Sequence, residues 1–207
     1  IIVKSDNPKL VGRIFTAKVV ELALANYPGW FSKDAIGSGT PFIVYWPTLI
    51  DSKYVKETVH IDDKETEILP TNQLKLADSE KPNVDIIVPD FNVVETEEIY
   101  FGRLIGARSG DKGGCANLGV WVKSDKAYSF LYHFLTVQKL KELLSDLTDY
   151  KIERFDFPNL KAVNFYIHGI LGDGASSNTK VDALAKSLGE YLRAKKVNVP
   201  KELLKEI

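Results

Sequence analysis

Residues 106–119 constrain the fold of this chain most, because they place five glycines between two apolar runs. The run before them, residues 99–107, reads as a strand. After them Leu118, Val120 and Val122 alternate with other residues, as in a half-buried strand. Glycine permits the positive φ angles that tight turns need. The sequence therefore predicts a β-hairpin whose tip is the glycine-rich segment.

The side chains of this segment suit an anion. Arg108 and Lys112 add positive charge, and backbone N–H groups that converge in a glycine-rich turn form a concave anion site. We predict that the loop binds a phosphate or carboxylate through Arg108, Ser109, Gly110, Gly113, Gly114 and Asn117. The alternative is a solvated turn in which Asp111 only accepts bonds from turn amides. Arg108 would then pair with Glu98 or Asp156 on a neighbouring strand.

Two places could supply proton transfer. Lys112 could neutralise a carboxylate, an enolate or a phosphate while Asp111 moves a proton. Further along, period-2 alternation puts Asn164 and His168 on one polar strand face, and an imidazole titrates near neutral pH. We predict Asp111, Lys112 and His168 as catalytic and Asn164 as substrate-binding, with a surface or structural histidine as the alternative. Cys115 has no base within the motif and is predicted to be a packing residue.

Composition narrows the function classes. The 27 Lys and Arg balance 28 Asp and Glu, so no overall field favours nucleic acid or an anionic membrane. One cysteine cannot form an internal disulfide, and the sequence has no apolar run of about 20 residues. We expect a cytoplasmic protein without a membrane partner. No metal-ligand spacing occurs, so we predict neither a metal nor a cofactor.

Periodicity outlines the elements. We predict a helix over residues 9–26, strands over residues 42–46 and 54–61, and an edge strand at residues 84–88 within a proline-containing linker. Aromatic residues of segments 26–31 and 44–47 could line a pocket or fill a core.

From residue 99 onwards the expected order is β-β-α-β-β-α. Its last helix would bury Leu184, Leu188, Tyr191 and Leu192 on one face. This order is typical of an α+β domain with two helices on one side of a sheet.

Several segments resemble the acyclic terpene utilisation (AtuA-type) family. Residues 107–114, the string Ala-Arg-Ser-Gly-Asp-Lys-Gly-Gly, are followed by Ala116 and Asn117, and this combination is distinctive of that family. Similar stretches lie at residues 5–6, 10–13, 18–29, 44–47, 102–104, 159–160, 164–165, 168–169 and 188–192. The family pattern has an acidic residue where this chain has Cys115, which argues against a carboxylate ligand at that position.

The resemblance implies a domain organisation and a role. Residues 1–70 would be the end of a larger α/β domain, residues 71–96 a linker, and residues 97–207 a ferredoxin-like domain. Family members look like components of acyclic terpene or branched-acid catabolism through coenzyme A thioesters, so the partner would be an acyl-CoA or another anionic small molecule. The alternative is a non-catalytic module that docks on a preceding region of the same protein or on another subunit. We also expect a homo-oligomer and, since the chain contains no Met, a preceding N-terminal region.

Overall fold

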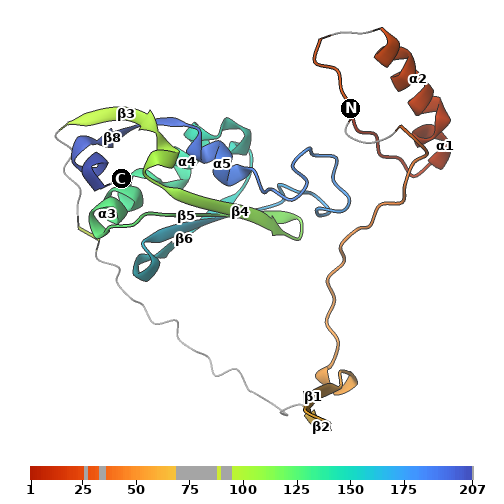
Figure 1. Ribbon diagram of the computed structural model, residues 1–207, viewed down its shortest axis with the longest axis horizontal. Helices are drawn as coiled ribbons and strands as arrows, with labels where there is room; N and C mark the ends of the chain where they lie inside the picture. Colours follow the sequence, from red (N-terminus) through yellow and green to blue (C-terminus); the bar gives the residue numbers. More distant parts are fainter. Residues whose placement is uncertain (26–27, 33–35, 69–87, 90–94, 207) are drawn as a thin grey trace. The chain divides into compact units, whose positions relative to one another are not determined.

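Residues 1–25, 28–32, 36–68, 88–89 and 95–206 are described in a computed structural model of the chain (Figure 1). Residue contacts divide the chain into one unit of residues 46–88 and another of residues 1–45 together with 89–207. The boundaries expected at residues 70 and 97 stay predictions. Most of the expected linker, with its edge strand, falls outside the described residues.

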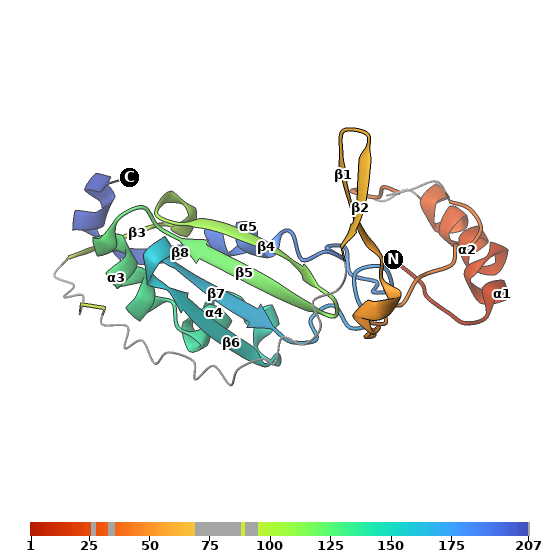
Figure 2. The same ribbon diagram turned by 90° about the horizontal axis from the view of Figure 1, so that it is seen from below.

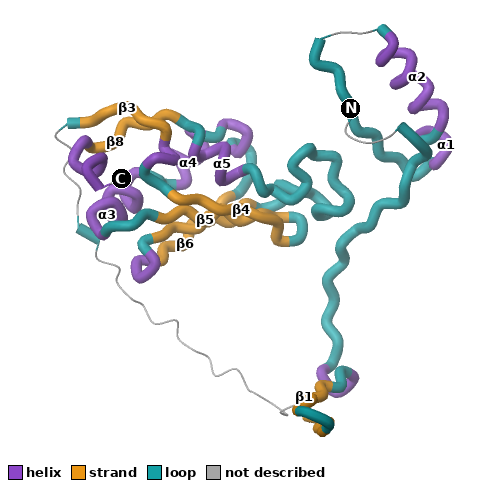
Figure 3. Tube along the Cα trace, in the orientation of Figure 1, coloured by secondary structure: helices purple, strands orange, loops and turns teal. Residues whose placement is uncertain are grey.

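The first 68 residues form local structure. Helices α1 (Pro8–Val11) and α2 (Arg13–Leu24) are separated by Gly12, and strands β1 (Glu57–Ile61) and β2 (Lys64–Ile68) pair antiparallel after a short 3-10 turn η1 (Ser52–Tyr54). The strand predicted over residues 42–46 is wrong, because this segment is loop (Figure 3). A strand needs a partner for its backbone groups, and periodicity alone does not supply one.

No residue is buried in the described part of residues 1–68. The aromatic side chains proposed for a core there are exposed instead, with Phe31 at 81% and Trp46 at 85%. These side chains therefore do not pack as a core in this part of the structure.

The C-terminal region contains a four-stranded antiparallel sheet of β4 (Gly106–Lys112), β5 (Cys115–Trp121), β6 (Ile152–Phe157) and β7 (Ala162–Ile167). Their order across the sheet is β4-β5-β7-β6. The predicted hairpin is confirmed, because β4 pairs with β5 in register from Gly106 opposite Trp121 to Lys112 opposite Cys115. The two strands are joined by a turn of only two residues.

The strand order identifies a ferredoxin-like topology with a shifted start. Strands β5 and β6 both run antiparallel to β7, so they are parallel to each other with β7 between them, which is a split βαβ unit. Helix α5 (Leu188–Arg193) follows β7, and the outer strand beside β5 is β4. In the β-α-β-β-α-β order that outer strand comes last, whereas here it comes first. The predicted α+β fold is confirmed with this permuted strand order.

Helices α3 (Asp125–Phe134) and α4 (Val137–Leu143) connect β5 to β6, and with α5 they lie on one face of the sheet (Figures 1 and 2). The single helix expected over this connection is broken after Phe134. Thr136 begins the second helix, because its hydroxyl accepts a bond from the Lys139 amide at 3.1 Å. Ser124 caps α3 in the same way through Ala127.

Under these helices lies the core. The inward residues of the two central strands are fully buried, and so are leucines from each helix: Ala116, Leu118, Val120, Val163, Phe165, Ile167, Leu131, Leu140 and Leu192. Burial of this alternating set is what holds the sheet under the helices.

A second, two-stranded sheet closes the domain. Strand β3 (Thr96–Tyr100) pairs antiparallel with β8 (Lys196–Pro200). A final 3-10 segment, η5 (Lys201–Glu206), follows β8. The single strand predicted over residues 99–107 is therefore wrong. The 3-10 turn η2 (Phe101–Arg103) interrupts it, because Phe101 is fully buried and turns the chain into the core.

The final helix is shorter than expected. Of the four residues predicted to face the core, Leu192 is buried, whereas Leu184 precedes α5 and is 46% exposed and Tyr191 is 38% exposed. Gly189 forms much of the contact instead. A Cβ atom there would lie 3.3 Å from backbone atoms of Ala107 and Arg108, so the missing side chain lets α5 approach β4 closely.

Candidate functional site

Register assigns each predicted site residue to one of two sheet faces. Side chains alternate along a strand, and residues paired across strands share a face. Ser109 and Asp111 pair with the buried Leu118 and Ala116, so they lie on the helix side. The opposite face, here called the open face, carries no helix of residues 96–206. It consists of Gly106, Arg108, Gly110, Lys112, Cys115, Asn117, Gly119, Trp121, Glu153, Phe155, Phe157, Ala162, Asn164 and Tyr166.

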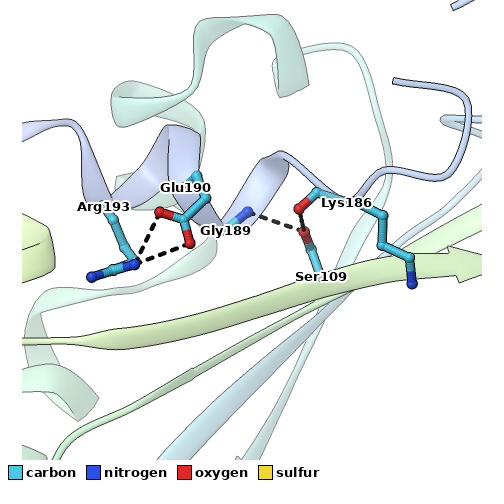
Figure 4. A network of polar contacts seen from close by, with 5 residues as sticks. All are labelled: Ser109, Lys186, Gly189, Glu190 and Arg193. Carbon is cyan, nitrogen blue, oxygen red and sulfur yellow. Dashed lines mark hydrogen bonds and ion pairs between the residues drawn. The ribbon is translucent and has the colours of Figure 1, made fainter. Parts of the chain in front are cut away.

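Ser109 joins the sheet to α5. Its hydroxyl donates to the carbonyl oxygen of Lys186 at 3.2 Å and accepts from the Gly189 amide at 3.0 Å (Figure 4). The side chain is 5% exposed. Ser109 therefore has a structural role, and its buried hydroxyl is directed away from the open face. Farther along the same helix, Arg193 donates to both carboxylate oxygens of Glu190, at 3.0 and 2.9 Å.

The loop that carries Lys186 is held by Asp182. The Asp182 carboxylate accepts from the amides of Lys186 and Ser187, at 2.8 and 2.9 Å, and from the Ser187 hydroxyl at 2.6 Å. Burial by itself would raise the pKa of Asp182, but these bonds outweigh it and hold that pKa below its ordinary value. The carboxylate form is therefore favoured in the folded protein.

Asp182→Asn is expected to lower the free energy of unfolding by about 1 kcal/mol at pH 7, because two or three bonds to a charged acceptor weaken. Since the folded pKa lies below the unfolded value of about 3.9, this stability is complete above pH ~4 and is lost as the pH falls through the folded pKa. Urea unfolding of both proteins should give curves that converge in acid. A difference that stays constant below pH ~4 would contradict this role for the carboxylate.

The tip of the hairpin differs from the anion loop that we predicted. Of the five glycines in residues 106–119, only Gly113 has a positive φ, at 63°. Gly114 has no positive φ, and it is required for close packing instead, because a Cβ there would lie 2.1 Å from the carbonyl oxygen of Gly172. The remaining motif residues belong to paired strands, in which successive amides point in opposite directions. The concave nest of converging amides is therefore wrong as a description of this segment.

Asn117 and Asn164 do come together, as expected for a common site. The Asn117 amide nitrogen donates to the Asn164 side-chain oxygen across β5 and β7 at 3.3 Å. Beside them Gly119 leaves a position without a side chain, where a Cβ would contact the Asn164 oxygen at 3.8 Å. The Asn164 amide nitrogen bonds no acceptor in the described part of the chain, so it can donate to a ligand on the open face.

Lys186 brings a cation to the same place. Its Nζ atom lies 2.8 Å from the position that a Cβ on Gly110 would occupy, and that position is 4.0 Å from the Asn117 side-chain oxygen. The Lys186 side chain runs down beside β4 while its carbonyl stays with Ser109 (Figure 4). Gly110 is therefore not a turn residue. It is the gap on the open face into which the ammonium group fits.

Arg108 stands one open-face position from Gly110 along β4 and is exposed. The pairings considered for it are not formed, because Glu98 pairs with Lys196 and Asp156 with Arg154. Within the described residues neither Arg108 nor Lys186 has a carboxylate within ion-pair distance of its charged group. Two cations thus flank the paired asparagines, and the charge of Lys186 also helps to lower the pKa of Asp182.

Lys112 and Asp111 are separated by the alternation of the strand. The Lys112 ammonium donates to the backbone carbonyl of Asp111 at 3.0 Å, on an exposed part of the hairpin end. The Asp111 side chain lies on the helix side. The structure therefore does not bring these two predicted catalytic side chains together on one face.

His168 lies at the turn end of the open face, just beyond β7. Its Nε2 atom is 2.6 Å from the Glu153 carboxylate, and its ring meets the edge of the Tyr166 ring at a centroid distance of 4.8 Å. Glu153 also bonds Lys151 at 3.1 Å. Cys115 belongs to this group, since its sulfur accepts from the Gly169 amide at 3.4 Å. Cys115 was predicted to be a packing residue, and the structure adds a polar contact of its sulfur with the Gly169 amide.

The other end of the open face is aromatic. Trp121, Phe155 and Phe157 are 42%, 46% and 44% exposed, and the Trp121 indole covers Gly106, where a Cβ would lie 2.3 Å from the ring. The open face is thus polar and cationic towards the hairpin turn and apolar towards the opposite end and the β6 edge.

A protein-family comparison supports this architecture. Residues 100–198 match the model of the AtuA ferredoxin-like domain. This part of the chain is an AtuA ferredoxin-like domain. The match covers the four-stranded sheet and helices α3 to α5, and of the β3–β8 pair it includes Tyr100 and residues 196–198. It confirms the predicted resemblance to the C-terminal part of AtuA-type proteins.

The other comparisons add no relatives: a search of curated proteins and a search of solved structures each gave no match. In the described residues no helix is long and apolar enough to cross a membrane. The same residues contain no group of three or more His, Cys, Asp or Glu side chains that could hold a metal ion.

Two residues of the AtuA ferredoxin-like domain's open face were missed by sequence reasoning. A third, Tyr166, is placed on this face by its alternation with Asn164 and His168 but was given no role in the predicted site. Glu153 could have been found only through the pairing of β6 with β7. Lys186 gave no signal, since it comes from a loop 77 residues away from Ser109, the residue to which its carbonyl is bonded.

Proposed function

We propose that the AtuA ferredoxin-like domain binds an anionic acyl thioester of the acyl-CoA type on its open face, in the breakdown of acyclic terpenes or branched acids. The observation that carries this proposal is the position of Arg108 and Lys186 beside Asn117 and Asn164. Charged nitrogen donors and an amide donor together suit a phosphate or carboxylate oxygen. The predicted residues Arg108, Asn117 and Asn164 keep their binding role in this proposal, and Gly110 contributes space for Lys186.

The aromatic end supports an acyl ligand. A bound anion that also carries hydrocarbon would place its apolar part against Trp121, Phe155 or Phe157, whose exposed rings gain most from leaving water. A free inorganic anion would use only the cationic end. The two chemistries on one face therefore favour an amphipathic ligand.

Binding of isovaleryl-CoA to the full chain, measured by titration calorimetry, tests the proposal. The double variant Arg108→Ala with Lys186→Ala is expected to bind at least tenfold more weakly, because each charged hydrogen bond contributes about 1.5–3 kcal/mol. The matched control is Arg103→Ala with Lys123→Ala, which removes one exposed arginine and one exposed lysine of the same domain. Equal weakening in both double variants, or none in either, would overturn the proposal.

The exposed rings also favour a second candidate function, a non-catalytic assembly module whose open face docks on another chain. The two functions separate in one comparison. If the Arg108 and Lys186 variant binds isovaleryl-CoA as the wild type does, while Phe155→Ser with Phe157→Ser changes the molar mass in light scattering, the assembly function holds.

A further inference from the structure

Four side chains with complementary chemistry meet at the turn end of the open face: Cys115, Glu153, Tyr166 and His168. Ala116 pairs with Ile167, the last residue of β7, and the Gly169 amide donates to the Cys115 sulfur at 3.4 Å. Cys115 therefore lies beside the turn that carries His168. Glu153 reaches His168 from the third strand, β6.

A backbone donor lies at the sulfur of Cys115. The Gly169 amide donates to it at 3.4 Å, and Tyr166 lies on the same face of the adjacent strand, opposite Asn117. Its interaction with Cys115, followed by burial, raises the pKa of Tyr166, so its hydroxyl keeps its proton. The Gly169 amide can therefore donate to the sulfur as it attacks a carbon atom.

His168 is arranged as a base. The Glu153 carboxylate accepts the Nε2–H bond at 2.6 Å, which leaves Nδ1 as the basic nitrogen of the ring. Lys151, and after it His168, hold the pKa of Glu153 below its ordinary value, so this carboxylate is charged at neutral pH. A nucleophile beside a base that a third group orients is the arrangement used in covalent catalysis.

We infer that Cys115 accepts the acyl group of a thioester bound on the open face, with His168 as the general base and Glu153 as the residue that positions it. This inference rests on the proposed function, because the same face must bind the thioester. The Cys115 sulfur attacks the thioester carbonyl carbon, and a new carbon–sulfur bond forms. The bond to the coenzyme A sulfur breaks. His168 takes the thiol proton and gives it to the departing coenzyme A thiolate, so no oxidant or reductant is required.

The spacing on the face suits this reaction. Asn117 is two residues from Cys115 along β5, about 7 Å away, and the Lys186 ammonium lies beside it. A thioester whose anionic part is held by Lys186 and Arg108 can therefore present its carbonyl to the sulfur. Lys112 is another charged group at this end, and its ammonium is bonded to the Asp111 carbonyl.

Intact-mass spectrometry of the full chain with isovaleryl-CoA tests the inference directly. One isovaleryl group should be added per chain and should map to Cys115, the single cysteine of the sequence. Cys115→Ser and Cys115→Ala should form no adduct yet bind isovaleryl-CoA within about threefold of the wild type. His168→Gln should slow acylation by about 100-fold or more. His60→Gln is the matched control, because His60 also faces a glutamate, Glu65, at 4.0 Å but lies in the β1–β2 hairpin.

The outcomes separate this inference from the proposed function. Binding without an adduct on the native chain would overturn the acyl transfer and leave the binding function intact. An adduct that maps elsewhere, or one that forms equally fast in His168→Gln, would also overturn it. Absence of both binding and adduct would remove the two proposals together. For Glu153→Gln, a rate profile shifted to another pH with the acylated residue unchanged is expected of a positioning residue, and a profile identical to that of the wild type would contradict that role.

Discussion

Gly114→Ala is expected to lower the free energy of unfolding by about 3 kcal/mol or more. The new Cβ would lie 2.1 Å from the carbonyl oxygen of Gly172, and the neighbouring Leu171 amide donates to the Gly114 carbonyl at 2.8 Å. The new Cβ would clash with a backbone oxygen, which cannot rotate away as the end of a side chain could. The β4–β5 hairpin or the segment after β7 must therefore move. Urea unfolding followed by circular dichroism measures the loss.

Gly113→Ala is the matched comparison at the adjacent turn position. Gly113 has a φ of 63°, which costs an alanine about 1 kcal/mol. The two variants separate close contact from backbone strain, because both lie in the same two-residue turn. Equal losses of about 1 kcal/mol would show that the approach of Gly172 does not limit the side chain at residue 114.

Phe165→Ala should produce the largest loss of stability in the domain, about 3–5 kcal/mol. Phe165 is fully buried on β7, between β5 and β6, where it faces the helices. Removing its ring leaves a cavity that the surrounding strands cannot close without losing their register. A lower midpoint in urea with an unchanged slope would report this effect.

Phe155→Ala on the neighbouring strand is its control. Phe155 lies on the open face and is 46% exposed, so its replacement should cost less than about 1 kcal/mol. The comparison tests the assignment of faces on which the site rests. If Phe155→Ala destabilised the domain as much as Phe165→Ala, the open face would be packed in the native protein.

The fold of residues 96–206 was largely predictable, because its strands alternate cleanly. Leu118 and Val120 on one strand and Val163 and Phe165 on another are all buried, as period 2 requires. The break of the predicted strand at Phe101 was not predictable, because an apolar residue is compatible with both a strand and a buried turn. Whether it continues a strand or turns into the core depends on the helix packed above it, where its ring meets Phe134 edge to face at 5.7 Å.

The candidate site was only partly predictable. Asn164 and His168 were found because they follow the polar alternation of residues 164–168, and Asn117 was found because it belongs to the glycine-rich segment. Asp111 and Ser109 were grouped with them by closeness in sequence, although neighbouring residues of a strand face opposite sides. These side chains could converge if residues 108–112 formed a turn. They form a strand paired with β5, so their side chains alternate between the two faces of the sheet.

The sequence by itself determined that residues 106–121 form a hairpin, that two further strands and flanking helices follow, and that one sheet face is apolar. These features depend on local patterns of glycine and hydrophobic residues. Only the tertiary structure decided the strand order β4-β5-β7-β6, the place of Lys186 beside Gly110 and the contact of Glu153 with His168. Each of these joins residues distant in sequence, and their pairing is selected by packing of the whole domain rather than by any local preference.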